Sequence, residues 1–140
     1  MADTYDFTGR TMVVTGGAGV LGGEIACSLV ACGAKVAILD KDPSLADRFQ
    51  DRLHQGPGSA IVVGGDVLDA AALAESEKSI CGEFGPIDTL INAAGGNHPR
   101  ATTGDDLPFF DLPADALRFV GELNLLGTIL PCQVFGRTFA

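Results

Sequence analysis

A glycine-rich segment near the N-terminus has the residue types and the spacing that suit a diphosphate ligand. Residues 15–22 read Thr-Gly-Gly-Ala-Gly-Val-Leu-Gly, which contains the pattern Gly-x-Gly-x-x-Gly at 17–22. In this pattern one glycine permits a tight turn, another lets backbone approach a phosphate, and the last lets a helix pack closely on a strand. A helix that starts here also directs N–H groups and a partial positive charge at the anion. The segment therefore predicts a dinucleotide site.

A carboxylate lies at the distance where such a site needs a ribose acceptor. Asp40 follows Gly22 by eighteen residues (40 − 22) and ends an apolar run at 36–39. A carboxylate there accepts hydrogen bonds from a ribose diol and repels a 2′-phosphate, so we predict NAD rather than NADP. Lys41 and Arg48 nearby could weaken that preference. The alternative is a turn that merely joins a strand to a helix, but the flanking elements and the spacing of Asp40 favour the cofactor site.

The elements that must position these residues alternate between strands and helices. Short apolar runs predict strands at 12–14, 36–39, 60–63 and 87–91. Apolar residues at helical spacing predict helices at 21–29, 43–54, 69–84 and from 113 to the end. This alternation is typical of an α/β fold with a Rossmann-like, doubly wound parallel sheet, and we expect the strand order 3-2-1-4.

Single residues mark the limits of these helices. Gly33 follows the first helix as a C-terminal cap would, and Asp42 and Asp69 precede the second and third helices as N-caps. Pro131 should kink the last helix or loosen its preceding turn.

The fourth predicted strand leads into a second turn of small residues, Asn92-Ala93-Ala94-Gly95-Gly96. Ligands of open α/β sheets bind outside the carboxyl ends of the strands, where the strand order reverses. Strands one and four should flank that crevice. The small residues leave room there for a flat ring, and Asn92 can tie the turn to neighbouring backbone.

Composition limits the classes of function. The chain has 140 residues, of which 46% are hydrophobic, enough for about one domain with its own core. A formal net charge of −9 argues against nucleic acid and against an anionic membrane face, since both recruit basic patches. No uninterrupted apolar run approaches membrane length, and the polar, acidic N-terminus is unlike a secretory signal. These features predict a cytoplasmic protein with neither nucleic acid nor membrane as a partner.

The four cysteines, Cys27, Cys32, Cys81 and Cys132, form no C-x-x-C and have no paired histidines. We therefore predict no metal site and no disulfide. They should behave as small, buried apolar residues.

Four motifs, in order, resemble those of the short-chain dehydrogenases/reductases across the whole chain. They are Thr15-Gly16 with Gly22, Asp66-Val67, Asn92-Ala93-Ala94-Gly95 and Asn124-Leu125-Leu126-Gly127. One departure is Val20, where the commoner single-domain pattern has glycine and where Gly19 supplies the flexibility one residue earlier.

The resemblance implies a role for each motif. The pyrophosphate would be bound by Gly16, Gly17, Gly19, Val20, Leu21 and Gly22. The adenosine ribose would lie on Asp40, and the adenine along Asp66 and Val67. The crevice beside the nicotinamide ribose would be shaped by Asn92, Ala93, Ala94 and Gly95. Asn124 would be the catalytic asparagine that anchors a water-linked proton relay.

Three further stretches, at 95–103, 109–112 and 130–136, are similar to the D-mannonate oxidoreductase (fructuronate reductase) branch of that family. The branch implies interconversion of D-fructuronate and D-mannonate by hydride transfer with a nicotinamide cofactor. Asn97, His98 and Arg100 would then lie near the sugar-acid substrate, and Arg100 could pair its carboxylate. The alternative for each is an ordinary polar residue on the rim of a loop.

The resemblance also implies a serine, and a tyrosine followed four residues later by a lysine, for proton transfer. The single tyrosine, Tyr5, precedes the first predicted strand, so the sequence holds no Tyr-x-x-x-Lys. We therefore expect residues 1–140 to be the N-terminal dinucleotide-binding part of a longer reductase, truncated before its catalytic half and inactive alone. The alternative is a dinucleotide-binding module without chemistry. Apolar surface along the fourth strand and the last helix predicts a homo-oligomer.

Overall fold

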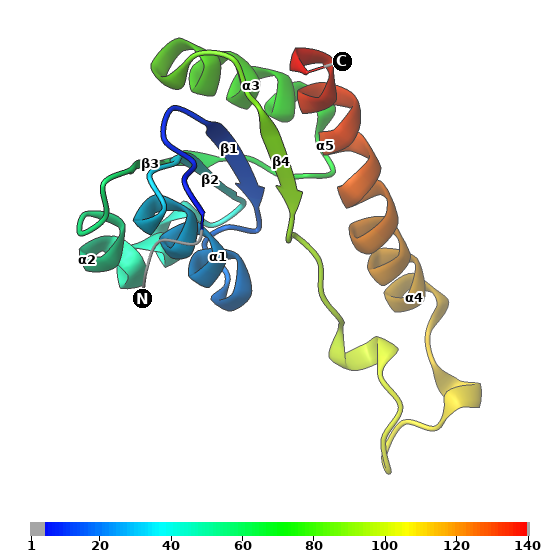
Figure 1. The fold of residues 1–140 in the computed structure, drawn as a ribbon. Coiled ribbons are helices and arrows are strands. Elements are labelled where there is room, and N and C mark those ends of the chain that lie inside the picture. Colours follow the sequence, from blue (N-terminus) through cyan, green and yellow to red (C-terminus); the bar gives the residue numbers. More distant parts are fainter. Residues whose placement is uncertain (1–4, 140) are drawn as a thin grey trace.

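The predicted strands form one parallel sheet in the order β3-β2-β1-β4 in the computed structural model, which describes residues 5–139 (Figure 1). The strands are β1 (Thr11–Thr15), β2 (Lys35–Asp40), β3 (Ser59–Gly64) and β4 (Thr89–Asn92). In the register of the sheet, Thr15 lies between Leu39 of β2 and Asn92 of β4. The carboxyl ends of these strands therefore meet at one edge, and the expected order 3-2-1-4 is confirmed.

Helices cover both faces of the sheet. One face carries α1 (Val20–Ala31), the 3₁₀ helix η1 (Pro43–Phe49) and α2 (Gln50–Leu53), and the other carries α3 (Ala70–Phe84) and α5 (Gly127–Phe135). Successive residues of β1 point to the two cores, because Val14 packs on the α1 side and Val13 on the α3 side. Phe135 is fully buried in the second core and anchors α5 there.

The buried side of α1 consists mostly of small residues rather than large apolar ones. Leu21, Ile25 and Leu29 have the spacing that predicts this helix, yet Leu21 is 77% exposed and Ile25 is 36% exposed. The buried residues are Gly22, Gly23, Ala26, Cys27 and Val30. Glycine and alanine let the helix approach its neighbours closely, which leaves the large side chains at its start facing outward. The helix ends before Gly33, whose φ of +90° confirms the predicted cap.

The helix predicted over 43–54 is mostly 3₁₀ helix, with a single α-helical turn at its end. The predicted cap at Asp42 is wrong, because its carboxylate accepts the Ser44 hydroxyl at 2.5 Å instead of helix N–H groups. Asp69 does cap α3 as predicted, by accepting two backbone N–H groups of the first turn.

β4 starts at Thr89, two residues later than the predicted strand, and Asp88 directly before it bonds to Thr11 of β1. Its N–H donates to the Thr11 carbonyl at 2.8 Å, and its carboxylate accepts the Thr11 N–H at 2.8 Å. Arg10 adds an ion pair at 3.1 Å. The Thr11 N–H, followed by Arg10, lowers the pKa of Asp88 below its ordinary value.

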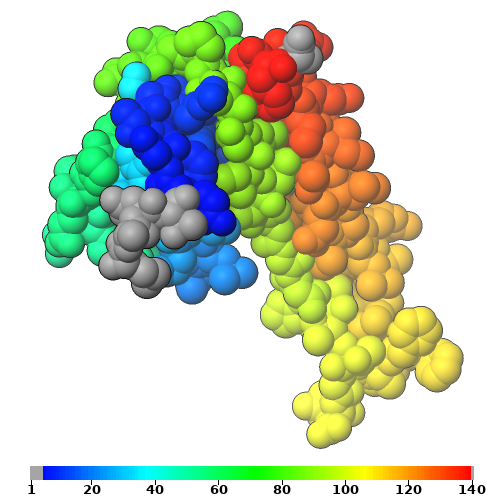
Figure 2. Space-filling view, in the orientation of Figure 1, coloured from blue at the N-terminus to red at the C-terminus, as the bar shows by residue number. Residues whose placement is uncertain are grey.

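Residues 96–113 form an arm that projects from the body of the molecule (Figures 1 and 2). The arm contains two short 3₁₀ helices, η2 (Pro99–Ala101) and η3 (Phe109–Asp111). Phe110, in η3, is 92% exposed. The arm therefore contributes little to either core.

An irregular helix follows the arm. α4 (Ala114–Gly121) passes through a π-helical turn (Glu122–Leu126) into α5, and a short 3₁₀ turn (Gly136–Thr138) follows. Pro131 lies buried inside α5. The sequence predicts a disturbance in the turn directly before this proline, but the π-helical turn lies earlier, at Glu122–Leu126. Within the described residues, Ala114–Thr138 is long and apolar enough to cross a membrane by length and composition alone, a test that core helices of soluble proteins also pass.

The cysteines differ in their burial. Cys27 is buried and Cys32 and Cys81 are partly buried, but Cys132 is exposed on α5. The prediction of small buried residues is therefore correct for Cys27 and wrong for Cys132.

Candidate functional site

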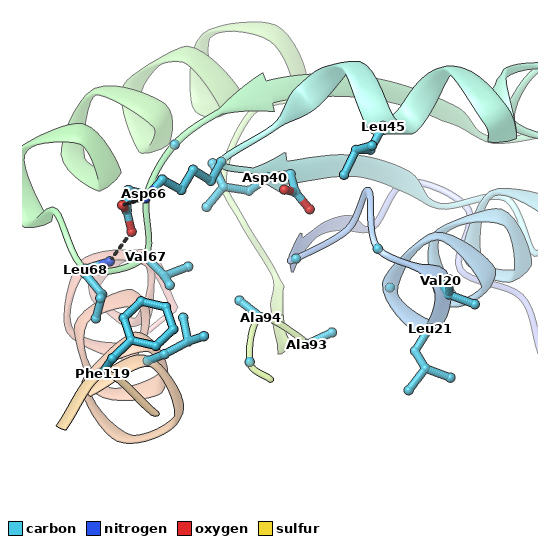
Figure 3. A pocket seen from close by; sticks show the side chains of 18 residues that line it. Val20, Leu21, Asp40, Leu45, Asp66, Val67, Leu68, Ala93, Ala94 and Phe119 are labelled. Atoms are coloured by element: carbon cyan, nitrogen blue, oxygen red, sulfur yellow. Dashed lines mark hydrogen bonds and ion pairs between the residues drawn. The ribbon is translucent and has the colours of Figure 1, made fainter. Parts of the chain in front are cut away.

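The carboxyl ends of the strands border a pocket of about 500 Å³ (Figure 3). Its walls come from the turn before α1, the ends of β2 and β3, the segment after β4, and the helix that follows the arm. Eleven residues predicted from the sequence line it, namely Gly16, Gly19, Val20, Leu21, Gly22, Asp40, Asp66, Val67, Ala93, Ala94 and Gly95. The fold thus brings together segments that are far apart in the chain.

The turn between β1 and α1 requires glycine at three places, because a Cβ at Gly16, Gly17 or Gly22 would lie too close to backbone atoms. Gly16 has a φ of +62°, and a Cβ there would lie 2.7 Å from the Ala94 Cα. A Cβ on Gly22 would overlap the Gly16 carbonyl oxygen, so this glycine lets α1 start directly behind the turn. Gly17 is buried behind the turn, where its Cβ would lie 2.7 Å from the Val14 carbonyl oxygen, and it stays outside the pocket lining.

The start of α1 opens onto the pocket. Its N-cap is Gly19, which has no side chain to accept the first N–H groups of the helix. Val20 and Leu21 are exposed and line the pocket wall beside these groups (Figure 3). An anion here gains both hydrogen bonds and the favourable end of the helix dipole.

Asp40 connects the end of β2 to the glycine turn. One carboxylate oxygen accepts the Ala18 N–H at 3.0 Å, and the other accepts the Asp42 N–H at 3.0 Å. A carboxylate has about four lone-pair sites, so these two bonds leave capacity for a diol. Asp40 can therefore hold the turn and accept a ligand at the same time.

Asp66 lies on another wall of the pocket and is held as a carboxylate. It accepts the Leu68 N–H at 2.9 Å and pairs with the Lys41 ammonium at 3.0 Å. The Leu68 N–H, followed by Lys41, lowers the pKa of Asp66 below its ordinary value. Lys41 thereby links the segments that follow β2 and β3.

The small residues after β4 form a further wall, which Asn124 fastens from the π-helical turn. Its amide nitrogen donates to the Gly96 carbonyl at 2.7 Å, and its amide oxygen accepts the Gly96 N–H at 3.1 Å. A Cβ on Gly95 would lie 2.8 Å from that amide oxygen. The Ala94 N–H donates to the Thr15 hydroxyl at 3.2 Å, which holds the wall against β1. Asn124 therefore supports the pocket from outside its lining, in a helix irregularity of a kind frequent at functional sites.

Asn92 lies at the end of β4 but contacts α5 instead of lining the pocket. Its amide nitrogen donates to the Cys132 sulfur at 3.3 Å. Its amide oxygen is buried and has no hydrogen-bond partner within residues 5–139. The expected tie from Asn92 to neighbouring backbone is replaced by this contact with α5.

Asn97, His98 and Arg100 lie in the arm and outside the pocket lining. Asn97 donates to a threonine hydroxyl of the arm at 2.8 Å. Arg100 forms a two-point ion pair with Asp115 of α4, at 3.0 and 3.2 Å, which lowers the pKa of Asp115. The His98 ring meets the Phe119 ring edge-on, with centroids 5.6 Å apart. Because Phe119 lines the pocket, His98 is one side chain away from it.

Seven lining residues lie outside the predicted set, namely Leu39, Lys41, Leu45, Gly65, Leu68, Phe119 and Leu123. Gly65 and Leu68 flank the Asp66-Val67 pair, so their position beside this motif could have predicted them as lining residues. Leu45 is different, because the 3₁₀ helix has 3.0 residues per turn and turns this side chain away from the face expected for an α-helix. Residues 5–139 bring together no group of three or more His, Cys, Asp or Glu side chains that could hold a metal ion.

Comparisons with known proteins agree with this geometry. A family model described as short chain dehydrogenase matches residues 10–140. UxuB, an uncharacterized oxidoreductase of Bacillus subtilis, is 38% identical over 140 residues, which cover 94% of this chain and 50% of that protein. An uncharacterized oxidoreductase of Haemophilus influenzae is 34% identical over 147 residues, which cover 98% of this chain and 52% of that protein.

A solved structure of an oxidoreductase also resembles this chain. It is that of a candidate D-mannonate oxidoreductase from Haemophilus influenzae with bound NAD, and it matches with a TM-score of 0.88 at 33% identity. The match covers 97% of this chain and 52% of that one. The chain thus spans about half the length of the relatives that it matches.

Proposed function

This chain belongs to the short-chain dehydrogenase/reductase family, and from that premise we propose that it is the dinucleotide-binding part of an NAD-dependent oxidoreductase. The observation that carries the proposal is the pocket of about 500 Å³, on which the glycine turn, Asp40 and Asp66 converge. The start of α1 suits a pyrophosphate, Asp40 suits a ribose diol, and Val67 offers an apolar contact to adenine.

Asp40 supports NAD over NADP. A 2′-phosphate on the ribose would face this carboxylate and meet repulsion. Lys41, a cation of the pocket lining, is already paired with Asp66 at 3.0 Å. The solved relative with bound NAD is consistent with this preference.

When bound, the nicotinamide ring accepts or donates the hydride. The residues of this chain bind and orient: the start of α1 holds the anion, and the small wall at 93–95 leaves space for the ring. Asn124 fixes that wall through Gly96. The family's serine and Tyr-x-x-x-Lys would supply the acid–base step, and residues 1–140 hold no Tyr-x-x-x-Lys. We therefore expect residues 1–140 alone to have no reductase activity.

The substrate that we propose for the complete enzyme is a sugar acid, interconverted between D-fructuronate and D-mannonate. The name of the solved relative supports this choice. His98 contacts Phe119 of the pocket lining, and Arg100 has, in its pair with Asp115, the two-point geometry that a carboxylate requires. For Arg100 to bind a substrate, that carboxylate would have to replace Asp115.

The test is a calorimetric titration of the protein with NADH, with NADPH as the matched ligand. We expect NADH to bind at least about tenfold more tightly, a difference of about 1.4 kcal/mol. A chain that binds neither ligand would contradict the proposal.

A second measurement addresses the chemistry. The absorbance of NADH, incubated with D-fructuronate and the 140-residue chain, should stay constant. Turnover by this chain would refute the expected inactivity. The full product of the coding sequence could also lack the serine, tyrosine and lysine. Tight NADH binding by such a product would instead identify a non-catalytic dinucleotide-binding module.

A further inference from the structure

The apex of the glycine turn is held by two charged side chains from different elements. The Ala18 N–H donates to the Asp40 carboxylate at 3.0 Å, and the Ala18 carbonyl accepts a hydrogen bond from the Arg48 guanidinium. Ala18 itself is fully buried. The Gly19 N–H, at the other end of the same peptide group as the Ala18 carbonyl, donates to the Gly16 carbonyl at 3.0 Å. The 18–19 peptide is therefore fixed at both its oxygen and its nitrogen.

Arg48 is placed for this contact by the packing of η1 against α1. The Phe49 ring occupies the space that a side chain at Gly23 would need, which docks η1 on the first turns of the helix. The Arg48 guanidinium lies 5.0 Å from the centre of the same ring. Arg48 thus reaches the turn from a segment that is itself fastened to α1.

The orientation of the 18–19 peptide matters for an anionic ligand. Its carbonyl oxygen carries partial negative charge and immediately precedes the N–H groups at the start of α1. A guanidinium that binds this oxygen keeps it turned away from the place where a pyrophosphate would lie. Removal of Arg48 would leave a buried carbonyl without its charged partner and free the peptide to rotate.

We propose that Arg48 is a positioning residue for dinucleotide binding, which acts through the Ala18 carbonyl to keep the start of α1 directed at the pyrophosphate. This inference rests on the proposed function. It assigns Arg48 to the diphosphate part of the ligand and leaves the adenosine part to Asp40 and Asp66. The two parts can therefore be separated by measurement.

The test compares Arg48→Met and Arg48→Lys with the unmodified protein, using ADP and adenosine as ligands in calorimetric titrations. Arg48→Met should weaken ADP binding about tenfold, the effect of losing one hydrogen bond to a charged group, and leave adenosine binding unchanged. Arg48→Lys keeps a cationic donor and should recover part of the ADP affinity. Arg52→Met is the matched control, because Arg52 pairs with Glu24 on the outer side of α1 and should leave both affinities unchanged.

Equal losses of ADP and adenosine affinity in Arg48→Met would indicate a purely structural role and overturn the inference. Unchanged ADP affinity would overturn it too. Should Arg48→Met fail to fold, Arg48→Lys carries the test, with an expected loss of about threefold for ADP alone. An unmodified protein that binds neither ligand would instead overturn the proposed function, and this inference with it.

Discussion

At the scale of single residues, Asp40 has two tasks that use different lone pairs of one carboxylate. It accepts the Ala18 and Asp42 N–H groups, each at 3.0 Å, and it faces the pocket. The first task fixes the turn, and the second would select the ribose. A change at this position should therefore alter both the affinity and the choice of ligand.

Asp40→Asn should weaken NADH binding about tenfold, because an amide has one acceptor oxygen where the carboxylate has two. NADPH binding should fall less, since the repulsion of a 2′-phosphate is relieved, and the ratio of the two dissociation constants should narrow. Fluorescence titration with both ligands measures that ratio. Asp42→Asn is the control, because the Asp42 carboxylate bonds Ser44; a ratio unchanged by Asp40→Asn would contradict the assignment.

Asp88 is a second carboxylate whose effect can be measured, through stability. Its folded pKa is lowered from 3.8, so its contribution to the free energy of unfolding is complete above that pH and is lost as the pH falls through the lowered value. Asp88→Asn should cost about 1 kcal/mol at pH 7, where the bond to the Thr11 N–H is weakened. The difference between the proteins should shrink below pH 3.8.

Urea denaturation at pH 7, 4 and 3 follows that difference, with Asp105→Asn in the exposed arm as the control. A cost at pH 3 as large as that at pH 7 would show that the charge of Asp88 is not the cause.

At the scale of elements, the contact between the glycine turn and α1 decides whether the pocket forms. Gly22 and Gly82 are both helical glycines, but their surroundings are opposite. A Cβ on Gly22 would overlap the Gly16 carbonyl, whereas a Cβ on Gly82 in α3 would meet no atom within 4 Å. The same substitution should therefore have opposite effects at the two sites.

Gly22→Ala should destabilise the protein by about 1–3 kcal/mol through overpacking against backbone and should abolish NADH binding. Gly82→Ala should stabilise it by about 0.5–1 kcal/mol, because alanine is the better helix former and has room. Thermal unfolding and NADH titration of both variants test this pair. Stabilisation by Gly22→Ala would show that the close approach of turn and helix is not required.

The sequence predicts the elements better than their contacts. The run at 36–39 places Asp40 at a strand end, and parallel pairing then brings it to the turn. The spacing of Leu21, Ile25 and Leu29 finds α1 but not its buried side, because close packing selects Gly22 and Ala26. The contact between Arg48 and Ala18 has no local signal, since it depends on a 3₁₀ helix that resembles an α-helix in sequence.

At the scale of the whole molecule, apolar surface gathers on the outer side of the last helix. Leu125 is 63% exposed and Ile129 is 40% exposed, one helical turn apart. Among the strands of residues 5–139, β4 pairs with β1 alone, so its other edge has no strand partner. Surfaces of both kinds promote association.

We predict that the 140-residue chain forms dimers or larger species. The double substitution Leu125→Lys with Ile129→Lys should shift it toward the monomer. Size-exclusion chromatography with light scattering gives the mass directly. Phe110→Ser, which removes an exposed aromatic side chain from the arm, is the comparison. It tests whether association depends on the arm rather than on the last helix. A monomeric unmodified chain would contradict the prediction.

The arm also divides the pocket along the chain. The glycine turn, both carboxylates and the wall at 93–95 precede it, whereas Phe119 and Leu123 follow it. A single cut by chymotrypsin after the exposed Phe110 would leave two fragments, joined by Phe135 in the core beneath α3. The arm is therefore a suitable place to divide the chain for a split reporter. Reassembly of the two fragments would restore the pocket and could be measured as recovered ligand binding.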